Sequence, residues 1–251
     1  MKIREIFSKT LLTKTGIPSF DYCINPYVGC QHGCRYCYAG FMKRFTGHRE
    51  PWGEFVDVKV NAPQVLRKQL RRAKRGEVCI SSVTDPYQPL EKKYRLTRGC
   101  LEALLEVQFP VDVLTRSSLC LRDLDLFKQF KEIDVGFSIG THDEKIKRIF
   151  EPHTPSVASR IEALKILHQA GVSTYSFIGP MLPLDPRRMV TLLEGKVDAV
   201  LIDRMNYPNR VKGLYRMKKL DSYLEDDYFQ IYGKELKERF EQKGISVSMV
   251  F

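Results

Sequence analysis

The sequence contains no apolar stretch long enough to cross a membrane. Its longest apolar runs, such as residues 111–114, fall far short of the ~18 residues that a transmembrane helix requires. Residues 1–5 carry charges where a secretion signal would need an apolar core, so we read no such signal. These absences predict a soluble protein located in the cytoplasm.

Internal repeats, low-complexity segments and long Gly/Ser/Pro linkers are also absent. At ~150 residues per domain, 251 residues suggest one or two domains, although an α/β barrel of this length often forms one. Hydrophobic residues make up 43% and charged residues 28%, which excludes wholesale disorder. We therefore expect one domain over residues 1–251, with a core at about 20–205 and a C-terminal helix and strand extension at 206–251.

Acidic residues are in deficit, with 30 Asp and Glu against 41 Lys and Arg, which gives a net charge of +11. This excess favours anionic partners, nucleic acid first among them. The densest basic run, 67–75, lies in a helix that we predict over 62–75. It contains no aromatic residues for base stacking, so it is either a solvated helix face or a phosphate-binding surface.

Short β-rich runs alternate with longer helical patterns, which predicts βαβ units and a parallel sheet with right-handed crossovers. We expect an α/β fold that forms a partial parallel (β/α)6 barrel, with a doubly wound open sheet as the alternative. Ligands of such folds bind at the carboxyl ends of the strands. The predicted strands are 19–27, 78–83, 111–115, 135–139, 173–178, 199–202 and 245–251. The predicted helices are 62–75, 97–108, 121–131, 156–170, 186–194 and 223–243.

The predicted helix 156–170 has capping residues at both ends. Pro155 and Ser156 stand at its start, and Gly171 follows its end. Its expected buried stripe consists of Ile161, Leu164, Ile166, Leu167 and Ala170.

The seven cysteines are odd in number and unevenly spaced, at 23, 30, 34, 37, 79, 100 and 120. Without a secretion signal, such clustering indicates metal or redox chemistry rather than a disulfide framework. Cys30, Cys34 and Cys37 form a C-x3-C-x2-C motif after the first predicted strand. Thiolates are soft ligands for iron–sulfur clusters, zinc or copper(I).

Structural zinc sites and ferredoxin clusters take four protein ligands, and this loop supplies three cysteines. His32 could be a fourth ligand, but we expect it to point outward from the loop. A four-iron cluster on three cysteines would leave one iron open to an exogenous ligand. The alternative is a zinc site that borrows a distant cysteine such as Cys23 or Cys79.

With an aromatic residue, Tyr36, before the last cysteine, the loop resembles that of the radical S-adenosylmethionine (radical SAM) enzymes. The resemblance implies a 4Fe–4S cluster on Cys30, Cys34 and Cys37, whose open iron chelates S-adenosylmethionine (SAM). An electron from an external one-electron reductant would cleave SAM to methionine and a 5′-deoxyadenosyl radical, which abstracts hydrogen from the substrate. The backbone near Tyr36 would lie by the adenine.

Segments beyond the loop are similar to the spore photoproduct lyase branch of these enzymes, over about 25–183. The similarity implies cofactor contacts from Thr84, from Arg116 in place of a lysine near the cofactor carboxylate, and from Ser138. Thr84 could instead cap a turn, and Ser138 could be a small core residue. The segments that carry the similarity are 81–91, 94–98, 122–126 and 150–152.

One position departs from that branch, because Ser82 stands where the lyase has a hydrogen-donating cysteine. The serine O–H bond is too strong to replace it, and Cys79 could do so only with a three-residue shift of the alignment. We therefore assign no catalytic residue and leave the substrate unidentified. Nucleic acid is the first candidate, and a peptide or small metabolite is the next.

Several other residues have two possible roles. Asp85 either orients the cofactor or caps a turn, and Tyr207 and Arg210 either face substrate or belong to a surface loop. Cys23, Cys100 and Cys120 are expected to be small core residues. The rival to an enzyme is a non-catalytic zinc- or nucleic-acid-binding protein that uses the same cysteine loop.

Overall fold

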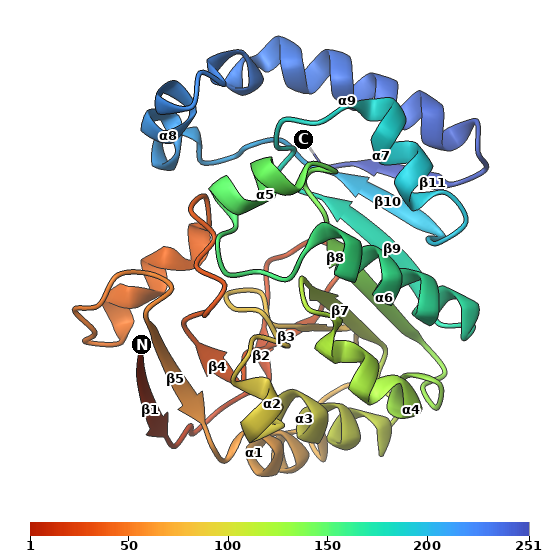
Figure 1. The fold of residues 1–251 in the computed structure, drawn as a ribbon. Coiled ribbons are helices and arrows are strands. Elements are labelled where there is room, and N and C mark those ends of the chain that lie inside the picture. Colours follow the sequence, from red (N-terminus) through yellow and green to blue (C-terminus); the bar gives the residue numbers. More distant parts are fainter. Residues whose placement is uncertain (251) are drawn as a thin grey trace. The chain divides into compact units, whose positions relative to one another are not determined.

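From residue 55 onward, strands and helices alternate along the chain, as the sequence predicts (Figure 1). The computed structural model describes residues 1–250. They form two compact units, each described by itself below. The first unit comprises Met1–Gly33 and Tyr38–Val135, and the second comprises Cys34–Cys37 and the chain from Gly136 onward. The expectation that the whole chain acts as one domain stays a prediction.

Parallel strands form the centre of the first unit. β3 (Tyr22–Ile24) pairs in parallel with β6 (Val78–Ile80), which pairs in parallel with β7 (Val111–Thr115). A short strand, β2 (Thr13–Lys14), runs antiparallel to β3. The helices α1 (Ala62–Leu70) and α3 (Leu96–Leu105) connect these strands, with α2 (Glu91–Tyr94) just before α3. The carboxyl ends of β3, β6 and β7 therefore lie at one edge of the sheet.

A smaller sheet in this unit was not expected from the sequence. β1 (Lys2–Ile6) pairs in parallel with β5 (Phe55–Lys59), and β4 (Tyr27–Val28) pairs antiparallel with β5. The predicted strand 19–27 is thus wrong as one element, because β3 ends at Ile24 and β4 joins the other sheet. Pro26, which has no N–H to donate, lies at this break.

The second unit repeats the parallel arrangement. β9 (Ser173–Ile178), β10 (Ala199–Ile202) and β11 (Ser246–Met249) are consecutive parallel strands, and β8 (Ile133–Ser138), by which the chain enters this unit, neighbours β9. The long helix α9 (Asp226–Glu241) packs against α7 (Pro186–Leu193) and β11 (Figure 1). The remaining helices are α5 (Glu144–Phe150), α6 (Val157–Gln169) and α8 (Lys212–Met217).

Helix α6 confirms the predicted caps and corrects the predicted stripe. The Ser156 side chain accepts a hydrogen bond from the Ser159 N–H at 3.1 Å, and Gly171 adopts a φ of +78° after the helix. Ile166 is 37% exposed, whereas Arg160 is only 1% exposed. The buried positions are 157, 160, 161, 163, 164 and 167, which lie on one face of the helix. Ile166 lies on the opposite face from that stripe.

Other helices are shorter than expected. α1 ends at Leu70, so the basic run 67–75 continues past the helix. The predicted helix 121–131 is a 3₁₀ turn, η2 (Ser118–Asp123), followed by α4 (Leu124–Phe127). The α/β class with parallel strands is confirmed in both units. Within residues 1–250, no helix is both long and apolar enough to span a membrane.

Candidate active site

The loop that carries Cys30 begins at the carboxyl edge of the first unit's sheet. Gly29 adopts a φ of +95°, and a Cβ on it would lie 2.3 Å from the Phe55 carbonyl oxygen, so only glycine fits. The Thr84 hydroxyl donates a 2.6 Å hydrogen bond to the Gly29 carbonyl and accepts one from Gln88 Nε2 at 2.9 Å. Residues that follow β6 therefore hold the backbone next to Cys30, which is 7% exposed.

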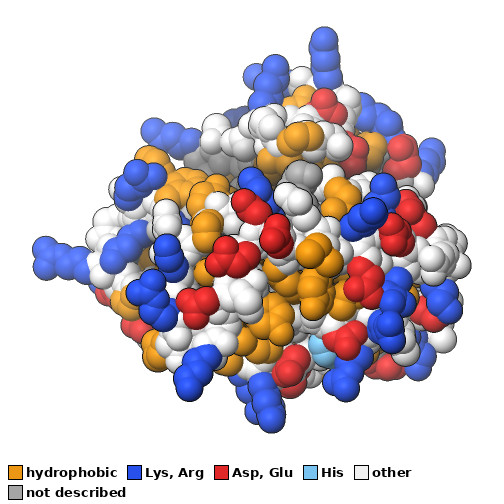
Figure 2. Space-filling model, turned by 90° about the horizontal axis from the view of Figure 1, so that it is seen from above, with side chains coloured by type: hydrophobic (Ala, Val, Ile, Leu, Met, Phe, Trp, Pro, Cys, Tyr) orange, Lys and Arg blue, Asp and Glu red, His pale blue; other side chains and the backbone are white. Residues whose placement is uncertain are grey.

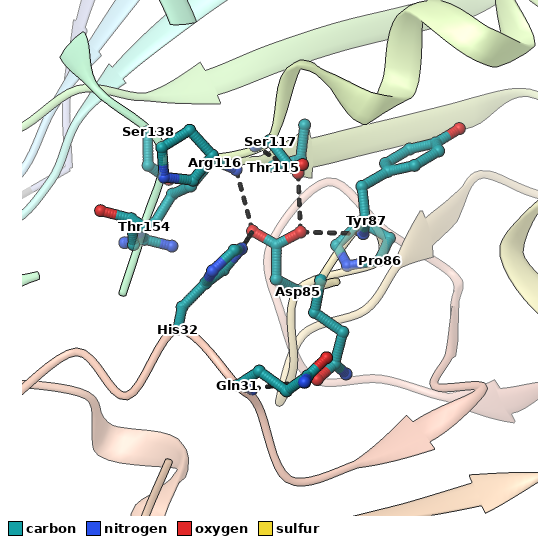
Figure 3. Close-up of polar contacts among 12 residues, drawn as sticks. Gln31, His32, Asp85, Pro86, Tyr87, Thr115, Arg116, Ser117, Ser138 and Thr154 are labelled. Carbon is teal, nitrogen blue, oxygen red and sulfur yellow. Dashed lines mark hydrogen bonds and ion pairs between the residues drawn. The ribbon is translucent and has the colours of Figure 1, made fainter. Parts of the chain in front are cut away.

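Asp85 is the centre of a buried cluster at the ends of β6 and β7 (Figure 3). Its Oδ1 accepts from the Thr115 hydroxyl at 2.7 Å and from the Tyr87 N–H at 2.8 Å, and its Oδ2 accepts from the Arg116 N–H at 2.8 Å. His32 Nε2 lies 3.3 Å from Oδ2. Asp85 thus caps the turn that follows it and also joins β6, β7 and the cysteine loop.

The expectation that His32 points outward is wrong. Its side chain is buried, 1% exposed, because the Asp85 carboxylate behind the loop offers it a partner. His32 Nδ1 has no hydrogen-bond partner within residues 1–250. Burial raises the pKa of Asp85, but its interactions with His32, the Thr115 hydroxyl and the Arg116 charge lower that pKa to about 2. Asp85 is therefore ionised at neutral pH.

Cys23 and Cys79 are register partners on β3 and β6, and Ser82 lies close to Cys23. Cys23 Sγ accepts from Asn25 Nδ2 at 3.2 Å and lies 3.2 Å from Ser82 Oγ. A hydrogen bond with Cys79 is the main cause that lowers the pKa of Cys23, and the pKa of Cys79 is raised in turn. Cys23 is buried as expected, but it has polar neighbours. Cys100 and Cys120 are fully buried core residues.

Segments that carry the similarity to the lyase branch form a polar scaffold in the first unit. The Arg122 guanidinium bonds to Glu91 at 2.7 Å and to Asp123 at 2.8 Å. Asp123 also accepts from Arg98 at 2.9 Å and from the Tyr87 hydroxyl at 3.0 Å. This network holds the turn after Asp85 in place, so these residues support the site.

In the second unit, Tyr36 is bound to a buried ion pair. Its hydroxyl donates to the Glu151 carboxylate, and Arg160 Nη2 lies 2.6 Å from the other carboxylate oxygen. Arg160 comes from α6 and also donates to the Ser138 carbonyl at 2.9 Å. Tyr36 and Ser138, two residues expected at the cofactor, are therefore joined through Glu151 and Arg160. Ser138 is 1% exposed, and its Oγ has no hydrogen-bond partner in the part of the chain that is described.

Backbone contacts fix the rest of the segment Cys34–Cys37 within this unit. The Arg35 N–H donates to the Phe150 carbonyl at 2.9 Å, and Arg210 Nη1 donates to the Cys37 carbonyl at 3.0 Å. Arg210 is exposed, as is Tyr207 at 51%. The expectation that Arg210 faces substrate stays a prediction, and sequence reasoning missed Arg160 and the role of Glu151. A charged residue at a buried position of the α6 stripe was the available signal for Arg160.

The donor set fits an iron–sulfur cluster. Cys30 and Cys34 are each 7% exposed, and Cys37 is partly exposed. Among the described residues, no group of three or more His, Cys, Asp or Glu side chains is arranged to hold a single metal ion. The cysteines of a four-iron cluster each bind a different iron, so they need not converge on one point. The buried, unpartnered Ser138 Oγ and His32 Nδ1 are donors of the kind that a bound ligand satisfies.

Comparison with known proteins finds relatives of this chain. An uncharacterised protein of Methanocaldococcus jannaschii is 40% identical over 183 residues, which cover 73% of this chain and 69% of that protein. A protein of Pseudomonas phage M6 named a radical SAM Nalpha-GlyT isomerase is 27% identical over 72% of this chain and 35% of its own length.

The fold has a counterpart among solved structures. Spore photoproduct lyase complexed with dinucleoside spore photoproduct superposes with a TM-score of 0.71 at 16% identity, over 99% of this chain and 82% of that chain. At this identity the likeness concerns the fold alone. The radical SAM superfamily model matches residues 24–194, which is most of the chain. The chain therefore belongs to the radical SAM superfamily and is a radical SAM enzyme.

Proposed function

We propose that Cys30, Cys34 and Cys37 hold a 4Fe–4S cluster and that the chain cleaves SAM reductively to abstract hydrogen from a substrate, with nucleic acid as the first candidate. The main support is the bracing of the cysteine loop. Thr84 and Asp85, both from the turn after β6, contact Gly29 and His32 on either side of Cys30. A cluster ligand needs such outer partners to keep its orientation.

When bound, the cluster supplies the electron that splits SAM into methionine and a 5′-deoxyadenosyl radical. The chain's own part is to bind and orient SAM and to exclude water. The buried side chains of Cys30 and Cys34 and the buried pair of Glu151 and Arg160 serve the second purpose.

Three side chains and one stretch of backbone are proposed to bind SAM. Ser138 Oγ offers an unused donor, and Thr84 Oγ1, which already donates once and accepts once, keeps one lone pair for a cofactor N–H. Arg116 presents a guanidinium that can grip a carboxylate with two parallel hydrogen bonds. Tyr36 supplies backbone near the adenine, with its ring held by Glu151.

The substrate assignment rests on chemistry beside the cysteine loop. Arg210 reaches the Cys37 carbonyl, and the exposed Tyr207 precedes it by three residues, so we propose that both face substrate. A solved neighbour of the same fold binds a dinucleoside photoproduct. The electron would come from an external one-electron reductant. The cytoplasmic location stays a prediction.

The test is anaerobic reconstitution with iron and sulfide, followed by reduction with SAM and quantification of 5′-deoxyadenosine. We expect about four iron atoms and four sulfides per chain. The variant with Cys30, Cys34 and Cys37 all replaced by alanine should lose both cluster and product. A control in which Cys100 and Cys120 are replaced by alanine removes two cysteines outside the loop and should keep both. Zinc without sulfide, or equal product from both variants, would overturn the proposal.

A further inference from the structure

An exposed row of aromatic rings follows the last cysteine of the motif. The 3₁₀ helix η1 (Tyr38–Phe45) carries Tyr38, Phe41 and Phe45, with ring centroids 6.4 Å apart for the first pair and 6.3 Å for the second. Tyr38 is 39% exposed and Phe45 is 72% exposed. Single exposed aromatic residues are normal on protein surfaces, but here three neighbouring rings follow one another on one short element. We call these three rings the aromatic row.

Basic side chains lie beside the aromatic row. The Arg44 guanidinium lies 5.8 Å from the Phe41 ring centroid and 5.9 Å from that of Phe45, so it bridges the two rings. Lys43 and Arg49 add two more positive charges, and residues 38–49 contain no Asp or Glu. The first carboxylate after them, Glu50, is already paired with Lys2 at 3.3 Å. Positive charge beside the rings is therefore available to an anionic ligand.

The inner end of the aromatic row touches the candidate active site. The Tyr38 hydroxyl donates to the carbonyl of Ser82, which follows β6 and lies beside Cys23. From that end the rings lead outward to Phe45, all within the first unit. A ligand that lies along the row would thus have one end at the carboxyl edge of the sheet, where the cofactor contacts are proposed.

The basic run 67–75 offers a contrast. Arg67 pairs with Glu106 at 2.9 Å and Arg75 pairs with Glu132 at 2.5 Å, so part of its charge is neutralised. It also has no aromatic residues. On the face drawn in Figure 2, lysine and arginine side chains lie dispersed among acidic ones. The combination of exposed rings with unopposed cations distinguishes the aromatic row from the basic run.

We propose that the aromatic row with Lys43, Arg44 and Arg49 binds single-stranded nucleic acid, stacking bases on its rings and contacting phosphates with its cations. This proposal rests on the proposed function, because it names the substrate class of the same site. Stacking needs exposed ring faces and accepts any base, and the cations supply the salt-dependent part of binding. A duplex presents its bases only in the grooves and would bind more weakly.

The test is fluorescence anisotropy of the full-length chain with a fluorescein-labelled 12-nucleotide oligothymidylate, with and without the cluster. We expect Phe45→Ala to weaken binding about 5- to 100-fold. Phe7→Ala is the matched control, because Phe7 is also a highly exposed phenylalanine, at 81%, in the same unit. It should leave the affinity unchanged. Likewise, Arg44→Gln should weaken binding and flatten its salt dependence, whereas Arg72→Gln in the basic run should not.

Equal losses for Phe45→Ala and Phe7→Ala, or no loss in either, would overturn the proposal. So would tighter binding of a duplex of the same sequence. A wild-type dimer that Phe45→Ala converts to a monomer would show instead that the row joins two copies of the chain. Binding to the oligonucleotide needs neither cluster nor SAM, so a chain that binds but produces no 5′-deoxyadenosine would refute the proposed function and leave this proposal standing.

Discussion

Replacing Arg160 by methionine is expected to destabilise the second unit strongly. Arg160 is 1% exposed, and its Nη2 bonds to Glu151 at 2.6 Å and to the Thr154 hydroxyl at 2.5 Å. Its Nη1 bonds to the Ser138 carbonyl at 2.9 Å. Methionine has a similar length but no charge. The substitution therefore leaves the Glu151 carboxylate buried, 2% exposed, without its guanidinium partner.

The magnitude follows from the loss of that guanidinium partner. Removing one partner of a buried ion pair costs about 3–5 kcal/mol. In a chain of this size each 1 kcal/mol lowers the midpoint of thermal unfolding by about 2–4 °C, so we expect a loss of about 6–20 °C. Replacing both partners, as Arg160→Met with Glu151→Gln, removes both charges and should recover most of the loss. The glutamine oxygen can still accept the hydrogen bond from Tyr36.

A matched control lies in the same unit. Arg239 pairs with Glu235 at 2.6 Å, but these side chains are 32% and 36% exposed. Arg239→Met should therefore cost at most about 1 kcal/mol. Differential scanning calorimetry of the wild type, Arg160→Met, Glu151→Gln, their double variant and Arg239→Met gives the comparison. If Arg160→Met and Arg239→Met shift the midpoint equally, or if the double variant loses the sum of its single losses, the reasoning is wrong.

The same substitution should loosen the cysteine segment locally. Glu151 holds the Tyr36 hydroxyl, and the adjacent Phe150 carbonyl holds the Arg35 N–H at 2.9 Å. Without Arg160, both anchors of the segment Cys34–Cys37 weaken. Amide hydrogen exchange of a peptide covering this segment should become faster in Arg160→Met than in Arg239→Met.

Three further substitutions separate cofactor contacts from structural ones. Asp85→Asn should lower the free energy of unfolding by about 2 kcal/mol at neutral pH, because the wild-type pKa is lowered to about 2. In urea unfolding, this difference from the wild type should fade as the pH falls from about 4 to 2. A difference independent of pH would contradict this. Ser138→Ala should leave stability unchanged or slightly raised, because it removes a buried hydroxyl without a partner among the described residues. It should nevertheless weaken SAM binding about 10-fold in calorimetry. The control Ser176→Ala, on the neighbouring strand, should keep the SAM affinity. Thr84→Val should lower the free energy of unfolding by about 1–3 kcal/mol, because it loses the hydrogen bonds to Gly29 and Gln88. Thr84→Ser should keep these bonds and the wild-type stability. A valine variant as stable as the wild type would show that these bonds do not stabilise the fold.

The parallel strands could be predicted from sequence because their signals are local. The central strands are short apolar runs, and the crossover helix α6 has its own start and stop residues, Ser156 and Gly171. Signals of this kind depend only on residues that are close to one another in the sequence. The cysteine motif is equally local, because its three thiols fall within eight residues of one loop.

The smaller sheet and the burial of His32 could not be predicted for the opposite reason. β1 pairs with β5 across about fifty residues, and the Arg4 guanidinium finds the Asp57 carboxylate at 2.7 Å over the same separation. His32 likewise owes its burial to Asp85, which lies far along the chain. No local sequence pattern identifies an interaction partner so far away along the chain.

Arg160 lies between these two cases, and it shows what a single sequence can reveal about a site. The stripe at positions 157, 160, 161, 164 and 167 has helical spacing, and an arginine on it contradicts the apolar pattern. Such a residue must either be exposed by an irregular helix or be buried with a carboxylate partner. The second option requires a buried acid elsewhere, and Glu151 precedes a proline in a segment without other acids up to Ser156. A polar residue where the pattern demands an apolar one thus points to a buried network, and networks of this kind gather where a fold must hold a functional loop.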